Sequence, residues 1–167
     1  MLLCTNTELK DSNPEMPTKQ ASPDPHPQYG DQDQRKPVLY VVDDEKSIGE
    51  FIAYAAEDAG FDVQVLCSAY DLQDKWEECI PDVVVMDIIM PGIDGIELVS
   101  WLAKKHYDLP TILMSGYDTR YINLASQLAD ALQVNIVASL HKPISLVTLI
   151  TLLKRLERQF SDKRARH

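Results

Sequence analysis

The chain has 167 residues, of which 45% are hydrophobic and 25% are charged, a composition typical of one soluble domain with a substantial core. Its formal net charge of −10 disfavours direct nucleic-acid binding, because phosphates repel such a surface. The three cysteines are far apart and lack metal-ligand spacing, so neither a disulfide framework nor a zinc site is expected. No stretch has the pattern of a signal peptide or a membrane span, which predicts a cytoplasmic protein without membrane association.

The composition divides the chain into three predicted segments. Residues 1–36 are rich in proline and polar residues and carry only isolated apolar side chains, so they cannot bury enough surface to offset the entropy of ordering. We therefore expect a disordered arm over 1–36, a folded domain over 37–160 and a flexible basic tail over 161–167.

The first half of the domain alternates apolar runs with helical patterns. A buried strand is predicted over 38–42, followed by a helix that Asp44 or Glu45 caps and Gly60 ends. A second strand over 61–66 precedes a helix over 69–78 with Ser68 as its N-cap. The run 83–86 predicts a strand buried on both faces that stops at Asp87, and the following proline and glycine at 91–92 force the chain out of the sheet.

The second half repeats this alternation. Asp94 is the expected cap of a helix reaching about residue 105, and a short strand over 111–114 ends at Ser115. A helix over 118–132 carries an apolar stripe, and a fifth strand over 134–140 comes just before Lys142. A closing helix starts near residue 146. The stripe of the fourth helix consists of Tyr121, Leu124, Leu128, Ala131 and Leu132.

Five strand-then-helix units without a hairpin signal predict parallel strands joined by right-handed crossovers, an α/β doubly wound sheet with helices on both faces. The carboxyl ends of parallel strands meet at one edge, which is where such folds place their chemistry. That edge is expected to collect Asp43, Asp44, Asp87, Ser115 and Lys142.

Three neighbouring carboxylates repel one another and cannot all stay ionised without a compensating positive charge. A bound hard cation such as Mg²⁺ is the simplest source of that charge. Lys142 offers a point charge for a phosphoryl oxygen, and Ser115 offers a hydroxyl donor. Asp87 is then a candidate nucleophile.

These motifs together resemble the receiver domain of two-component response regulators. The matching residues are DD at 43–44, MDIIMPGIDG at 86–95, MSG at 114–116 and KP at 142–143, and the resemblance spans about residues 37–158. It implies a five-stranded flavodoxin-like fold. It also implies that Asp87 accepts a phosphoryl group from a histidine kinase or phosphotransfer protein. The implied Mg²⁺ ligands are Asp43, Asp44, Asp87 and the backbone carbonyl of Ile89, while Ser115 and Lys142 grip the phosphoryl group.

The resemblance implies a phosphorelay module rather than an enzyme, with self-phosphorylation from small donors at most. Output is expected through contact with a downstream protein, with a homodimer possible. Ser139 replaces the aromatic residue that the family often has three positions before the lysine. Ile89 and Tyr117 flank the site by resemblance, and neither would orient a water, which predicts slow self-dephosphorylation.

Three other interpretations remain open. A haloacid dehalogenase-type phosphatase would need a second aspartate where Ile89 stands. A flavodoxin-like flavin-binding module would share the fold, yet the acidic first loop would repel an anionic cofactor. The third interpretation is a receiver-like interaction module that does not use phosphate, and only a phosphorylation assay would distinguish it from a phosphoacceptor.

Overall fold

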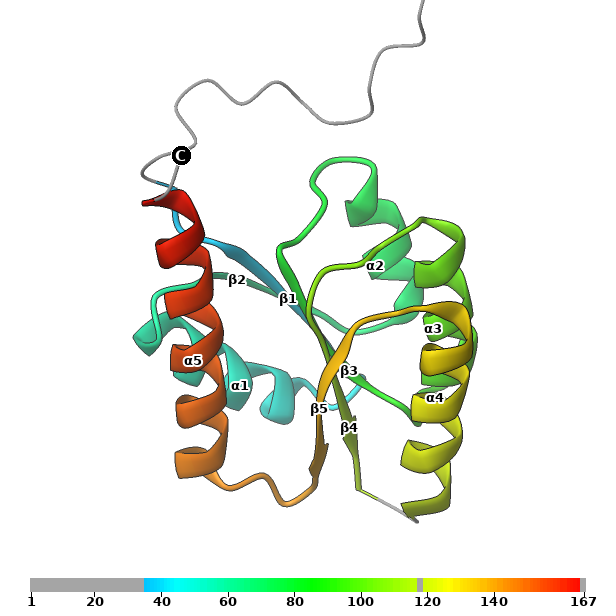
Figure 1. Ribbon diagram of the computed structural model, residues 1–167. Coiled ribbons are helices and arrows are strands. Elements are labelled where there is room, and N and C mark those ends of the chain that lie inside the picture. The colour runs from blue at the N-terminus through cyan, green and yellow to red at the C-terminus, as the bar shows by residue number, and fades with distance from the viewer. Residues whose placement is uncertain (1–34, 117–118, 166–167) are drawn as a thin grey trace, which may run out of the picture. The chain divides into compact units, whose positions relative to one another are not determined.

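The computed structural model describes residues 35–116 and 119–165. Within these residues, five parallel strands form one sheet in the order β2-β1-β3-β4-β5, and five helices cover it (Figure 1). The predicted doubly wound α/β fold is therefore confirmed. The strands are β1 (Val38–Val42), β2 (Asp62–Leu66), β3 (Val83–Asp87), β4 (Thr111–Ser115) and β5 (Ile136–His141). The helices are α1 (Lys46–Asp58), α2 (Ala69–Trp76), α3 (Gly95–Lys104), α4 (Thr119–Leu132) and α5 (Leu146–Arg164).

The helices form two layers, with α1 and α5 on one face of the sheet and α2, α3 and α4 on the other (Figure 1). Alternate residues of the central strands serve the two layers: Leu39 and Val41 pack with α1 and α5, whereas Tyr40 and Val42 pack with the other three helices. Because both faces are covered, β3 is buried at every position, which explains its unbroken apolar run.

All strands run in the same direction, so their carboxyl ends share one edge of the sheet. Along that edge Asp87 of β3 pairs with Met114 of β4, and Ser115 of β4 pairs with His141 of β5. The strand ends that the sequence singles out are therefore neighbours in the structure.

Most predicted caps and stops are confirmed. The hydroxyl of Ser68 accepts a hydrogen bond from the N–H of Asp71 at 3.1 Å, and the Asp94 carboxylate accepts from the first turn of α3. Gly60 ends α1 in the left-handed region at φ +103°. Glu45, one of the two predicted caps of α1, is its N-cap residue, but the Glu45 side chain makes no capping hydrogen bond. The Glu45 N–H is instead bound by the Asp43 carboxylate at 2.9 Å.

The apolar stripe predicted for α4 differs from the face that this helix buries. Tyr121, Leu124 and Leu132 are exposed, while the buried positions are Ile122, Ala125 and Ala129. The buried face of α4 therefore consists of one isoleucine and two alanines, and Leu128 of the predicted stripe is only partly buried.

The observed boundaries of two elements also differ from the predicted ones. Val134 belongs to the turn that closes α4, since its N–H bonds the carbonyl of Ala129 at 2.8 Å, and β5 starts only at Ile136. Helix α5 continues to Arg164, beyond the predicted boundary at residue 160, because Phe160 packs against the core and Ser161 bonds the Glu157 carboxylate. The predicted arm lies outside the described residues except for positions 35 and 36.

Candidate functional site

Asp87 is the last residue of β3 and is only 6% exposed. One carboxylate oxygen, Oδ1, accepts the N–H of Ile89 at 3.1 Å. The chain just beyond Asp87 is held on both sides, because the Ile88 N–H bonds the carbonyl of Met114 at 2.9 Å and the Ile88 carbonyl accepts the N–H of Gly95 at 2.8 Å. The carboxylate is therefore presented from a backbone that the neighbouring strand and the start of α3 both fix.

Gly95 makes this close return possible. A Cβ at this position would lie 2.5 Å from the Cα of Ile88 and 2.8 Å from the carbonyl oxygen of Asp87. Both neighbours are backbone atoms, so they cannot turn away as a flexible side chain could. The loop from Asp87 to Gly95 needs glycine at its end for steric reasons alone.

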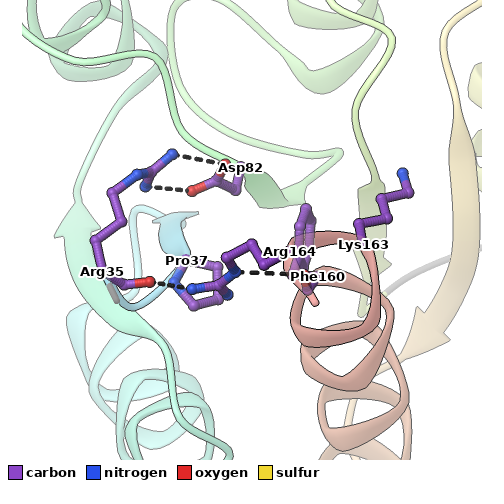
Figure 2. Close-up of a pocket in the computed structure, with 6 residues that line it drawn as sticks. All are labelled: Arg35, Pro37, Asp82, Phe160, Lys163 and Arg164. Carbon is purple, nitrogen blue, oxygen red and sulfur yellow. Dashed lines mark hydrogen bonds and ion pairs between the residues drawn. The ribbon is translucent and has the colours of Figure 1, made fainter. Parts of the chain in front are cut away.

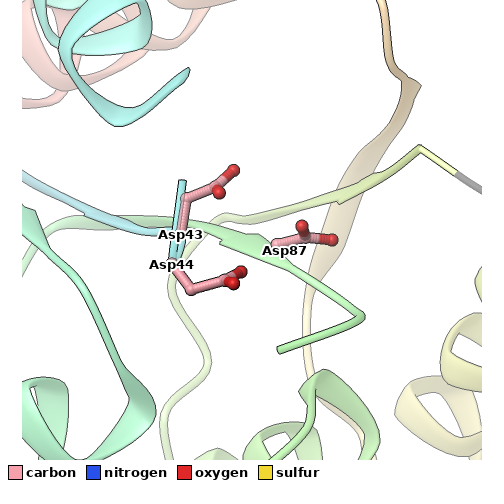
Figure 3. A group of neighbouring side chains, drawn as sticks. All are labelled: Asp43, Asp44 and Asp87. Carbon is pink, nitrogen blue, oxygen red and sulfur yellow. The ribbon is translucent and has the colours of Figure 1, made fainter. Parts of the chain in front are cut away.

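Asp43 and Asp44 follow directly after β1, the neighbour of β3 in the sheet. Asp43 is fully buried, and its N–H bonds the carbonyl of Leu66 at 3.1 Å, whereas Asp44 is exposed. Carboxylate oxygens of Asp43, Asp44 and Asp87 lie within 4.8 Å of one another (Figure 3). The structure thus brings together the three carboxylates that the sequence predicts as a group.

Lys142 supplies positive charge to this group. Its ammonium nitrogen lies 2.7 Å from Oδ2 of Asp43 and 2.6 Å from Oδ2 of Asp87. The backbone also fixes this residue, since the Lys142 N–H bonds the carbonyl of Ser115 at 2.9 Å. One ammonium therefore bridges the ends of two adjacent strands.

Burial and pairing shift the pKa values of this cluster. Burial raises the pKa of the Asp43 carboxyl, and the hydrogen bonds from Lys142 and from the N–H of Glu45 offset that only in part. Burial alone would lower the pKa of the Lys142 ammonium, but the hydrogen bonds to Asp43 and Asp87 outweigh it and raise the pKa. Lys142 therefore stays charged at neutral pH.

An open cleft of about 860 Å³ gives access to this cluster from solvent. Ile89 lines the cleft, and Ser115 is fully buried at the end of β4. The lining residues are Asp44, Glu45, Ile48, Asp87, Ile89, Met90, Pro91, Gly116, Lys142 and Pro143.

The donor set fits a hard divalent cation. Three carboxylates face a single ammonium, so the cluster keeps an excess of negative charge at neutral pH. Oxygen-only ligands beside an open cleft, where waters can complete the coordination, suit Mg²⁺. The exposed Asp44 carboxylate is not paired with Lys142 and is the most accessible of the three.

Sequence reasoning placed the cluster at the right edge but missed its internal pairing. It assigned Lys142 to an incoming phosphoryl group and did not anticipate the direct ion pairs to Asp43 and Asp87. It also did not anticipate that the missing Cβ of Gly95 lets the start of α3 approach Asp87 and Ile88 closely. The glycine after Asp94 was the available signal.

Comparisons with known proteins agree with this geometry. Residues 39–154 match the response regulator receiver domain family. The receiver domain of the Francisella response regulator 1452 shares 28% identity, over 75% of this chain and 99% of that one, with a TM-score of 0.64. Full-length FixJ from B. japonicum also shares 28% identity, over 75% of this chain and 60% of FixJ, with a TM-score of 0.64. A response regulator from Colwellia psychrerythraea, at 24% identity over 75% of this chain and 99% of that one, shares the fold with a TM-score of 0.66. The chain therefore belongs to the response regulator receiver domain family.

Proposed function

We propose that this chain is the phosphoacceptor of a two-component phosphorelay and that Asp87 takes the phosphoryl group. The phosphodonor would be the phosphohistidine of a histidine kinase or phosphotransfer protein, the partners with which receiver domains interact. The observation that carries the proposal is the pairing of the Asp87 carboxylate, at the floor of an open cleft, with the Lys142 ammonium at 2.6 Å.

In the proposed transfer, a carboxylate oxygen of Asp87 attacks phosphorus, an O–P bond forms, and the N–P bond to the donor imidazole breaks. The imidazole keeps the bonding electron pair and takes up a proton. The Ile89 N–H on Oδ1 orients the carboxylate for this attack. Asp43, Asp44, Asp87 and the Ile89 carbonyl would hold Mg²⁺, which supplies charge neutralisation for the phosphoryl oxygens when bound.

Lys142 has a second role in this proposal. Once Asp87 becomes an acyl phosphate, its carboxyl oxygens lose their charge, and the new phosphoryl group carries it instead. The ammonium is then drawn from the carboxylate toward a phosphoryl oxygen. Ser115, at the end of the adjacent strand, is the proposed hydroxyl donor to the same group. A shift of Lys142 and Ser115 would change the loop after β4, which gives the domain a way to signal by protein contact.

Slow loss of the phosphoryl group remains a prediction. Ile89 is 36% exposed and lines the cleft with an apolar side chain that cannot orient an attacking water. Tyr117, the other predicted flanking residue, lies outside the described residues. Phosphoaspartate in Ile89→Asn should decay faster than in the parent chain.

The proposal carries further consequences for location and assembly. None of the described helices is long and apolar enough to cross a membrane. We place the chain in the cytoplasm together with its phosphodonor, with a downstream protein or a second copy as the recipient of the signal. Its chemistry is limited to accepting and slowly losing a phosphoryl group, so it is not an enzyme in the usual sense.

Incubation with acetyl phosphate and Mg²⁺ tests the proposal. Intact-mass spectrometry should show one added phosphoryl group in the parent chain and none in Asp87→Asn. Asp94→Asn is the matched control, because that carboxylate caps α3 in the same loop and should not affect uptake. Uptake by Asp87→Asn equal to the parent would contradict the assignment, and no uptake by any variant would favour an interaction module that does not use phosphate.

A further inference from the structure

A second group of charged residues lies at the opposite edge of the sheet, where the strands begin. It surrounds a pocket of about 150 Å³ between the segment that enters β1, the start of β3 and the end of α5 (Figure 2). The pocket is lined by Arg35, Pro37, Asp82, Phe160, Lys163 and Arg164. None of these residues belongs to the acidic cleft, so the pocket is independent of the proposed phosphoacceptor function.

The single carboxylate in this pocket is already neutralised. Both oxygens of Asp82 accept from the Arg35 guanidinium, at 2.8 and 3.1 Å, and Oδ2 also accepts the N–H of Val38 at 2.8 Å. Figure 2 shows the guanidinium and the carboxylate facing each other. A bidentate pair of this kind leaves no net charge on Arg35 and Asp82 together.

The other two cations have no counter-charge. Arg164 donates to the carbonyl oxygens of Arg35 and Phe160, which are neutral acceptors, and its remaining N–H donors are left over (Figure 2). Lys163 makes no ion pair with any residue in 35–116 or 119–165. Figure 2 shows its ammonium directed away from the Arg164 guanidinium, so its flexible stem has to turn for the ammonium to reach a ligand beside Arg164. The pocket therefore holds one guanidinium without a counter-charge, and an unpaired lysine lies among its lining residues, in a chain whose formal net charge is −10.

The position of these cations at the end of a helix does not remove that excess. Lysine and arginine in the last turn favour the helix dipole, but the interaction amounts to a fraction of a charge and is screened in water. Here one cation is also held in place: the guanidinium of Arg164 is fixed by two carbonyls from separate parts of the chain. A guanidinium that is held in place and has free N–H donors can bind an oxyanion.

We propose that this pocket binds a small oxyanion group, a phosphate or a carboxylate, at the Arg164 guanidinium, and that the Lys163 ammonium turns toward the bound group. The volume is smaller than the roughly 300–1,000 Å³ of a typical small-molecule site. It has room for several water molecules, each with a share of about 30 Å³ of liquid, and therefore for a small oxyanion. Phe160 and Pro37 form apolar walls, so the charged group binds at one end of the pocket only.

Titration of the full chain with inorganic phosphate, and separately with acetate, tests this proposal. Backbone amide NMR shifts of residues 35–38 and 160–165 are followed in Mg²⁺-free buffer at fixed ionic strength. Lys163→Ala is the test variant because this exposed side chain has no structural partner among the described residues. Arg158→Ala is the matched control, since it removes the same charge from an exposed site on the same helix outside the pocket.

Saturable shifts are expected in the parent and in Arg158→Ala, with affinity about three- to tenfold weaker in Lys163→Ala because one charged contact is lost. Saturation by phosphate alone would assign a phosphoryl ligand, and saturation by acetate would assign a carboxylate. Shifts that rise linearly with concentration, or that respond equally in the two variants, would overturn the proposal.

Discussion

The two edges of the sheet carry similar groups in opposite balance. At the carboxyl edge, three carboxylates face one lysine, and Lys142, Asp43 and Asp87 have side chains only 14%, 0% and 8% exposed. At the other edge, three cations surround one carboxylate, and Arg35 and Asp82 are 40% and 17% exposed. The first cluster is enclosed by β1, β3 and β5, whereas the second lies at the surface where the chain enters and leaves the domain.

From this difference we expect burial, rather than the number of ion pairs, to determine how much stability each cluster loses when one charge is removed. A buried charge that loses its partner cannot be rehydrated without moving the backbone around it. An exposed charge is rehydrated at once. Phosphorylation or a bound cation should therefore change the electrostatic free energy of the acidic edge strongly. At the basic edge, water or a ligand can replace an ion pair at a small cost in free energy.

The largest difference between the two edges should be the stability lost when Lys142 or Arg35 is replaced by an uncharged residue. Lys142→Met leaves Asp43 and Asp87 buried without compensation and should lower the free energy of unfolding by roughly 2–4 kcal/mol without Mg²⁺, allowing for water in the open cleft. Arg35→Met should cost at most about 1 kcal/mol, because Arg35 lies at the surface, where water can replace its contact with Asp82, and the N–H of Val38 still binds that carboxylate. Urea denaturation of the two variants measures both values. Equal losses would mean that the acidic edge is no more enclosed than the basic one.

Backbone geometry at the acidic edge should be sensitive at one glycine and tolerant at another. Gly95→Ala forces a Cβ to within 2.5 Å of the Cα of Ile88 and should destabilise the domain by about 1–3 kcal/mol. Gly116→Ala places its Cβ 3.6 Å from the side chain of Lys142, an ordinary contact, and should change stability by less than about 0.5 kcal/mol. Thermal unfolding compares the two. Tolerance of alanine at position 95 would show that the loop after Asp87 can relax.

The excess of negative charge predicts how the acidic edge responds to divalent cations. Asp44→Ala should weaken Mg²⁺ binding by at least about tenfold, because it removes an exposed oxygen ligand. The fold should be unaffected, since Asp44 lies at the surface. Mg²⁺ titration by calorimetry checks the affinity, with Glu50→Ala on the exposed face of α1 as control. An unchanged affinity in Asp44→Ala would remove this residue from the ligand set.

The smallest expected effect concerns Tyr107, which contacts Trp76 and senses the charge of Asp82 at the basic edge. Burial raises the pKa of its phenol well above 10.0, with Asp82 and Asp108 adding to the shift. The unfolded chain therefore loses this proton near pH 10 while the folded chain keeps it, so stability is full below pH 10 and falls as pH rises further. Tyr107→Phe should remove that part of the alkaline loss.

The same substitution should cost little at neutral pH, because the Tyr107 hydroxyl has no hydrogen-bond partner among the described residues. Denaturation at pH 8 and at pH 11 provides the measurement, with the exposed Tyr70→Phe as control. Identical alkaline losses in Tyr107→Phe and in the parent would indicate that the phenol is hydrated in the folded chain.

The acidic edge could be predicted from sequence because its residues follow apolar strands directly. Apolar runs in the sequence predict the strands that precede these residues. Because the carboxyl ends of parallel strands share one edge of a sheet, Asp43, Asp87 and Lys142 could be grouped without coordinates. The ion pairs among them could not be predicted, because they depend on side-chain directions that the order of strands does not determine.

The basic edge had no such signal. Arg35 meets Asp82 across 47 positions and Arg164 across 129 positions, and none of the three lies at a recognisable spacing. Helix α4 shows a similar limit: of its predicted apolar stripe, Tyr121, Leu124 and Leu132 are exposed, while the alanines at 125 and 129 are buried. Periodicity identified the helix but not which part of its apolar arc would be buried.

Chemical trapping of the phosphorylated residue tests the central claim most directly. The chain is treated with acetyl phosphate and Mg²⁺ and then with borohydride, which reduces an aspartyl phosphate to homoserine, and tandem mass spectrometry locates the product. We expect homoserine at position 87 and unmodified aspartate at positions 43, 44 and 94. Homoserine at another carboxylate, or none in a chain whose intact mass shows a phosphoryl group, would contradict it.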